Sequence, residues 1–133
     1  MVLHNAAAMP VTFKGKRAIK VTAAPGIDPG AETLAIVSNV EFSNGAIELD
    51  LAGEPAQAVA SGARGFAGVA FRVQPDRAAY DCFYLRPTNG RAGDRERRNH
   101  AAQYISRPRF TWSKLRRETP SRYESYVDIQ AAE

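Results

Sequence analysis

Two carboxylates in one short segment are the candidate catalytic groups of this sequence. Glu48 and Asp50 stand two residues apart in a stretch that alternates between apolar and charged side chains. On a β-strand this spacing would place both on one face, about 6.7 Å apart along the chain. Paired acids at such a separation carry out glycosidic cleavage, one as the acid and the other as the nucleophile or base. A glycosidase-like hydrolase is therefore one hypothesis, but the less favoured one, because the next acid, Glu54, falls beyond the predicted strand.

Metal-binding and thiol chemistry have less support. Cys82 is the single cysteine, which excludes an internal disulfide framework and a cysteine-rich zinc site. The two histidines, His4 and His100, are far apart in the sequence, and no nucleophile motif accompanies His100. We therefore expect neither a metal ion nor a cofactor.

Arginine dominates the basic residues. Fourteen of the eighteen Lys and Arg residues are arginine, and all of them except Arg17 follow residue 60. The guanidinium group is a planar fork that binds carboxylates, phosphates or paired hydroxyl groups. The alternative explanation is a solvated surface of ion pairs that binds no ligand.

Five of these arginines gather in residues 86–98 and could contact the phosphates of a nucleic acid. Asp94 and Glu96 interleave them, and the formal net charge of the chain is only +4, so nucleic acid is disfavoured as a partner. The same region suits a sugar, because aromatic rings stack on pyranose faces and polar side chains bond hydroxyl groups. For Trp112 the alternative is ordinary packing of the side chain in the core or at its rim. The candidate ligand-binding residues are Arg86, Asn89, Arg98, His100, Tyr104, Trp112 and Glu124.

Period-two alternation indicates that β-strands position these residues. We predict strands at residues 11–13, 17–22, 34–42, 46–51, 66–73, 80–86, 100–106 and 123–129. Short strands at this spacing indicate an all-β protein, an antiparallel β-sandwich or barrel. Long loops are predicted at residues 53–65 and 87–99, and residues 109–119 are left unassigned between two prolines. The 133 residues suffice for a single domain, 1–133, with one core.

The alternation also predicts which side chains share a face of the sheet. Phe83 and Leu85 are expected in the core, with Tyr84 and Arg86 on the opposite face. If four of the strands form one sheet, its polar face suits a polar ligand, and the alternative is a salt-bridged outer face. The residues predicted on that face are Glu48, Asp50, Arg72, Tyr84, Arg86, Glu124, Tyr126 and Asp128.

The second half of the chain carries a set of motifs. They are GFAGVAFRV at residues 65–73, FYLRPTN at 83–89, QYIS at 103–106 and RYESYVDI at 122–129. As a set they resemble a bacterial subgroup of the concanavalin A-like lectin/glucanase (laminin G-like jelly-roll) superfamily. The resemblance implies a two-sheet jelly roll whose concave face binds saccharides or polyols in many relatives. Such domains continue with further strands after the last motif, so the predicted sandwich is incomplete at its C-terminus.

These observations predict a non-catalytic carbohydrate-binding or ligand-recognition domain that uses the polar face of a β-sheet. One alternative is a structural or assembly domain, completed by homo-oligomerisation through exposed strand edges. The other is the hydrolase. Residues 1–10 show no secretory signal, and no window approaches 18 consecutive apolar residues. A cytoplasmic protein without a membrane partner is therefore expected.

Residues 87–99 give the most specific expectation. This loop offers no side chain larger and more apolar than Ala92, so ion pairs and hydrogen bonds of its arginines must order it. We expect it to fold over the polar face of the sheet. Its flanking arginines, Arg86 and Arg98, should then point toward Glu48, Asp50 or Glu124.

Overall fold

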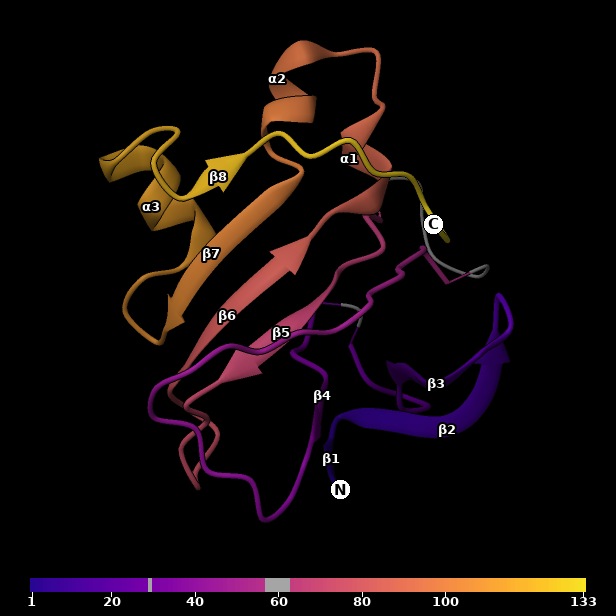
Figure 1. Cartoon of the computed structure of the whole chain (residues 1–133). Coiled ribbons are helices and arrows are strands. Elements are labelled where there is room, and N and C mark those ends of the chain that lie inside the picture. Colours follow the sequence, from indigo (N-terminus) through magenta and orange to yellow (C-terminus); the bar gives the residue numbers. More distant parts are fainter. Residues whose placement is uncertain (29, 57–62) are drawn as a thin grey trace. The chain divides into compact units, whose positions relative to one another are not determined.

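The computed structural model describes residues 1–28, 30–56 and 63–133. The protein is mostly β, with three small antiparallel sheets and a few short helices (Figure 1). The chain divides into two compact units, Met1–Glu41 and Phe42–Glu133, and each is described by itself. The described residues show no closed sandwich or jelly roll, so the finer fold and the single domain stay predictions. Residues 57–62 of the predicted loop 53–65 lie outside the described residues.

The first unit contains two small sheets. β2 (Ala6–Phe13) and β3 (Lys16–Ala23) form a hairpin, and β1 (Val2–His4) pairs with β4 (Leu34–Ile36). The predicted hairpin is confirmed, and its strands extend beyond the predicted bounds. Lys14 and Gly15 at its tip have positive φ angles of 47° and 79°. Positive φ at both central residues is the turn geometry that matches the right-handed twist of the flanking strands.

The second unit is built on one four-stranded antiparallel sheet. Its strands are β5 (Ala67–Phe71), β6 (Tyr80–Leu85), β7 (Ala102–Arg107) and β8 (Glu124–Ser125), in the order β5-β6-β7-β8. The strands predicted at residues 66–73, 80–86 and 100–106 are therefore confirmed. Each is followed in the chain by the strand it pairs with, as local hairpin-like connections allow.

Three other strand predictions need correction. Residues 46–51 form no strand, the strand predicted at 34–42 is limited to β4, and the strand predicted at 123–129 is limited to β8. Alternating side chains make an extended segment suitable for a sheet. A strand forms only where a neighbouring segment supplies hydrogen bonds to its backbone, which periodicity does not reveal.

The predicted loop at residues 87–99 contains two short helices, so that prediction is wrong. α1 (Pro87–Gly90) and α2 (Arg95–Asn99) lie beyond the ends of β6 and β7 in Figure 1. Pro87 is fully buried and Gly90 is also buried, so burial contributes to the order of the segment. The unassigned segment contains a third helix, α3 (Trp112–Glu118). None of the described helices is long and apolar enough to cross a membrane.

Our prediction of which face of the sheet is buried is wrong. Tyr84 is in register with Gln103, and Gln103 with Glu124, so these side chains share one face. This is the buried face: Arg86 is 5% exposed and Gln103 only 1%, whereas Phe83 is 52% exposed. One physical reason is α3, which contacts β7 and whose Arg116 donates to Glu124 on this face.

Candidate functional site

A single buried carboxylate lies at the centre of a polar cluster in the second unit. The side chain of Glu124, on β8, is only 3% exposed. Arg116 of α3 donates from Nε to Oε2 of Glu124 at 2.9 Å and from Nη2 to Oε1. Nη1 of Arg86 lies 3.5 Å from Oε1, and Nε2 of His100 lies 3.7 Å from Oε2. Glu124 therefore links α3 to the chain just after β6 and just before β7.

Arg86 is held by neutral partners as well. Its Nη1 donates to the backbone oxygen of His100 at 2.9 Å. Its Nη2 donates to Oη of Tyr84 at 3.0 Å and to Oε1 of Gln103 at 3.1 Å. The guanidinium carbon also lies 5.0 Å from the centroid of the Tyr84 ring. A buried guanidinium must have its donors satisfied, and the partners of Arg86 are all neighbours in the fold. Arg86 therefore has a structural role in the site.

Burial and the hydrogen bond to Glu124 are the main causes of the pKa shifts of the two arginines. Burial lowers the pKa of Arg86, and the adjacent Tyr84 and Glu124 raise it. The guanidiniums of Arg116 and Arg64 lower the pKa of Arg86 further. The pKa of Arg116 is raised, first by its hydrogen bond to Glu124. Arginine stays charged in proteins, so two cations share the one buried carboxylate.

Hydrogen bonds join α1 and α2, which together form one wall of the site. Arg97 donates from Nε to Oδ1 of Asn89 at 2.8 Å and from Nη2 to the backbone oxygen of Thr88 at 3.1 Å. Asn89 in turn donates from Nδ2 to the backbone oxygen of His100 at 3.2 Å. Oδ1 of Asp94 accepts from the backbone N–H of Arg97 at 2.6 Å and so caps α2. The wall is thereby tied to the start of β7.

These elements border a cleft of about 560 Å³. Two of its lining side chains are aromatic and largely exposed: Phe66 is 64% exposed and Trp112 is 46% exposed. The guanidinium carbon of Arg116 lies 4.8 Å from the centroid of the Trp112 ring, a cation–π contact. We call this feature the arginine cleft and define it by Arg64, Phe66, Arg86, Arg97, Trp112 and Arg116.

The structure brings most of the predicted ligand-binding residues together. Arg86, Asn89, His100 and Trp112 line the arginine cleft, and Glu124 holds two of its guanidiniums. Their assignment as binding residues stays a prediction, since geometry alone does not test it.

The predicted directions of two arginines have different outcomes. Arg86 points to Glu124, as expected. Arg98 does not point to an acid: its Nη1 donates to the backbone oxygens of Ala92 at 2.7 Å and Gly93 at 3.1 Å. Those carbonyl groups are closer along the chain and complete the turn between α1 and α2, so the prediction for Arg98 is wrong.

The candidate catalytic pair is not arranged as predicted. Glu48 and Asp50 are exposed in a segment outside the strands, and neither lines the arginine cleft. The expected spacing of two carboxylates on one strand face depended on a strand at residues 46–51. Without that strand, the geometric reason for glycosidic cleavage at this pair is lost.

Sequence reasoning missed four of the six residues that define the arginine cleft. Arg64 and Phe66 precede β5, Arg97 is on α2 and Arg116 is on α3. One signal was available: residues four apart on a helix share a face, so a helix at 112–118 would have placed Trp112 beside Arg116. No local pattern joins Arg64 to residues 50 positions later, because the sheet register brings them together.

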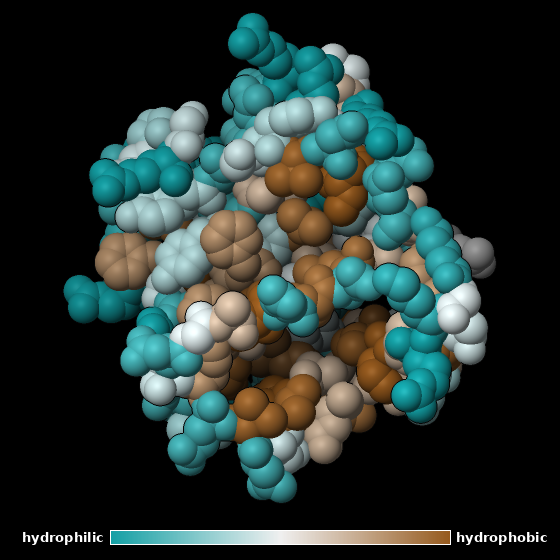
Figure 2. All heavy atoms as spheres, in the orientation of Figure 1, coloured by the Kyte–Doolittle hydropathy of each residue, from teal (hydrophilic) through white to brown (hydrophobic). Residues whose placement is uncertain are grey.

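The opposite face of the sheet carries a row of aromatic rings. The ring centroids of Phe83 and Tyr104 are 6.1 Å apart, and those of Tyr104 and Tyr123 are 5.9 Å apart. These rings border a second hollow of about 250 Å³. Tyr104 donates to Oδ1 of Asp81 at 2.9 Å on this face and is thus separate from the arginine cleft. Over β6 and β7, Figure 2 shows a surface that is brown and pale rather than teal.

Comparisons with protein-family models, curated proteins and solved structures find no match to the chain. The concanavalin A-like resemblance therefore stays a prediction. Within residues 1–28, 30–56 and 63–133, no three His, Cys, Asp or Glu side chains are grouped so that they could hold a metal ion.

Proposed function

We propose that the chain is a non-catalytic recognition domain that binds a saccharide or a similar polyol in the arginine cleft. The observation that carries the proposal is the exposure of Trp112 and Phe66 in a cleft with four guanidinium groups. Aromatic rings at such positions stack on the C–H faces of a pyranose, and N–H donors bond its hydroxyl oxygens. A cleft of about 560 Å³ has the size of ordinary small-ligand sites.

The carboxylates near the cleft favour binding over catalysis. Of the three carboxylates at the cleft, Asp94 caps α2 and Glu124 is held by Arg86 and Arg116, which leaves Glu96 as the one remaining acid. Glycosidic cleavage needs one acid free to donate a proton and another free to attack or to activate water. Groups engaged in structural hydrogen bonds are poorly suited to both tasks. A jelly-roll fold, of which the four-stranded sheet would form one layer, is part of the same proposal.

Trp112 makes the proposal testable by a matched pair of variants. It is the single tryptophan of the sequence, so ligand-induced fluorescence change in the unaltered chain reports directly on the cleft. In calorimetric titrations with neutral and acidic oligosaccharides, Trp112→Ala should weaken binding at least about tenfold, a loss of about 1.4 kcal/mol.

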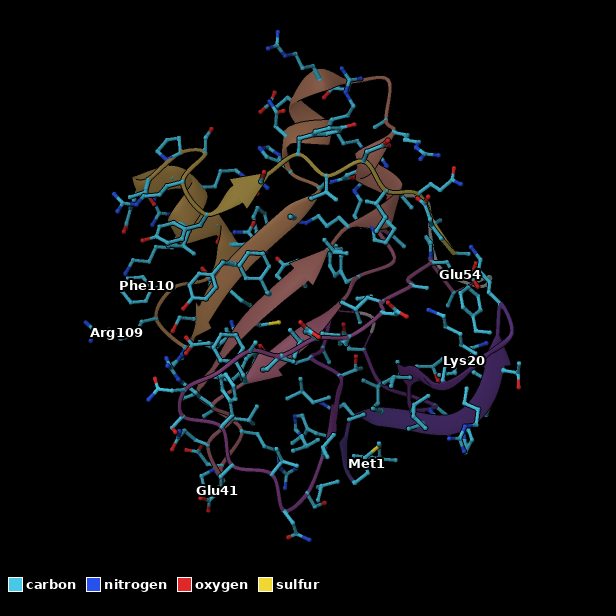
Figure 3. All side chains as sticks on the ribbon, viewed as in Figure 1. Met1, Lys20, Glu41, Glu54, Arg109 and Phe110 are labelled. Carbon is cyan, nitrogen blue, oxygen red and sulfur yellow. The ribbon has the colours of Figure 1, made fainter. Side chains whose placement is uncertain are left out.

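Phe110→Ala is the control, because Phe110 is 44% exposed but does not line the cleft. In Figure 3 its labelled side chain lies at the turn before α3. It should bind as the unaltered chain does. Equal losses in both variants, or no saturable binding of any saccharide, would refute the proposal.

The assembly hypothesis keeps one supporting observation. β5 is an end strand of the four-stranded sheet, and an end strand has a backbone edge that can pair with another chain. Sedimentation velocity at high protein concentration separates the two proposals. A dimer that persists on dilution supports assembly, and a monomer that binds saccharide supports recognition.

A further inference from the structure

The guanidiniums of the arginine cleft outnumber the carboxylates around them. Arg86 and Arg116 share the single carboxylate of Glu124. Arg97 donates hydrogen bonds to neutral acceptors, the amide oxygen of Asn89 and the backbone and hydroxyl oxygens of Thr88. The fourth guanidinium is that of Arg64.

The two acids that line the cleft, Asp94 and Glu96, complete the charge balance. With Glu124 they make three carboxylates against four guanidiniums, so the site has one positive charge in excess. Both Asp94 and Glu96 are exposed, whereas the arginines of the cleft are buried or half-buried. Solvent and salt screen exposed charges more than buried ones, so screening does not remove the positive excess inside the cleft.

A carboxylate fits this excess better than the other common anions. It carries a single negative charge, and its planar pair of oxygens matches the planar guanidinium fork in a bidentate contact. A phosphate monoester carries about 1.5 to 2 negative charges at neutral pH, more than the cleft can balance. The exposed rings of Trp112 and Phe66 stand beside these guanidiniums, so one ligand could present a ring and an acid group together.

We propose that the arginine cleft selects a saccharide that bears a carboxylate, a uronate, over a neutral saccharide of the same ring. This inference rests on the proposed function and names the class of its ligand. The carboxylate lies against the guanidiniums, and the sugar ring lies against Trp112. Arg64 is the guanidinium best suited to be tested, because it lies outside the network that Glu124 holds together.

The test compares an oligogalacturonate with its methyl ester, which keeps the ring and removes the charge. The free acid should bind the unaltered chain at least about tenfold more tightly than the ester, since hydrogen bonds to charged groups are the stronger ones. Equal affinities for acid and ester would overturn the uronate proposal and leave saccharide recognition standing. Failure of both to bind would overturn the two together.

Two variants locate the effect in the cleft. Arg64→Gln should reduce the ratio of acid affinity to ester affinity several-fold. Arg109→Gln removes the same charge from an exposed position outside the cleft, labelled in Figure 3, and should keep the ratio of the unaltered chain. An equal reduction of the ratio in both variants would mean that the preference comes from net charge, and an unchanged ratio in both would mean that Arg64 does not contribute to it. Either result contradicts the assignment.

Two further ligands test the chemical class. A sulfated oligosaccharide of the same length that binds more tightly than the uronate would overturn the choice of a carboxylate. A single-stranded oligonucleotide that binds more tightly than both would assign the cleft to nucleic acid and overturn the proposal as a whole.

Discussion

At the scale of residues, Glu124 is the group on which the arginine cleft depends. Its replacement Glu124→Gln keeps the shape of the side chain but leaves Arg86 and Arg116 without a shared anion. We expect the free energy of unfolding to fall by about 3 kcal/mol, the lower end of the range for a broken buried pair, because Arg116 is 34% exposed. Urea denaturation followed by circular dichroism measures this change.

The exposed pair of Arg117 and Glu118 provides the control for that measurement. Its nitrogen and oxygen are 3.4 Å apart, but the two side chains are 71% and 51% exposed. Solvent screens such a pair, so Glu118→Gln should change the free energy of unfolding by less than about 1 kcal/mol. Similar losses in the two variants would show that Glu124 has no special role.

Residue patterns predicted the composition of one sheet face but not its burial. The alternation in FYLRP correctly separated Tyr84 and Arg86 from Phe83. It wrongly placed Phe83 in the core, because period two defines which side chains share a face and not which face is covered. The deciding element, α3, is two turns long, and its bond to Glu124 joins segments that no local pattern connects.

At the scale of elements, Gly90 controls the packing of α1 against the C-terminal segment. A Cβ at this position would overlap the backbone oxygen of Ile129 and lie 2.7 Å from that of Val127. Because backbone atoms cannot move aside as side chains do, Gly90→Ala should destabilise the protein by about 1–3 kcal/mol. Thermal unfolding monitored by circular dichroism would show the loss as a lower midpoint.

Gly93→Ala is the matched control, because a Cβ there meets nothing within 4 Å. It should be neutral or slightly stabilising, since alanine restricts the unfolded chain more than glycine does. If Gly90→Ala were as stable as Gly93→Ala, the contact between α1 and residues 127–129 would not contribute to folding.

Helix signals were present at the elements that sequence reasoning missed. Pro87 stands at the first position of α1, Asp94 caps α2, and Thr111 accepts from the N–H of Lys114 to cap α3. Proline, aspartate and threonine are favoured at such positions. Because the helices are short, their apolar periodicity is weak. The residues at their N-termini are therefore the sequence signals that could have predicted them.

At the scale of the whole molecule, the division into two units makes a prediction about folding. The four-stranded sheet, the three helices and the lining of the arginine cleft all belong to Phe42–Glu133. We expect a chain of residues 42–133 to unfold cooperatively and to keep the saccharide affinity within about threefold, a change of about 0.6 kcal/mol. Chemical denaturation and calorimetric titration of this shortened chain measure the two quantities.

The outcome decides between one domain and two. A domain has its own core and could fold alone, so cooperative unfolding of residues 42–133 would correct the single domain predicted for 1–133. Loss of cooperativity would instead show that Met1–Glu41 is part of the same folding unit, and the single domain would stand. If the shortened chain folds but no longer binds saccharide while the full chain does, residues 1–41 contribute to recognition, which would contradict a site built from the second unit alone.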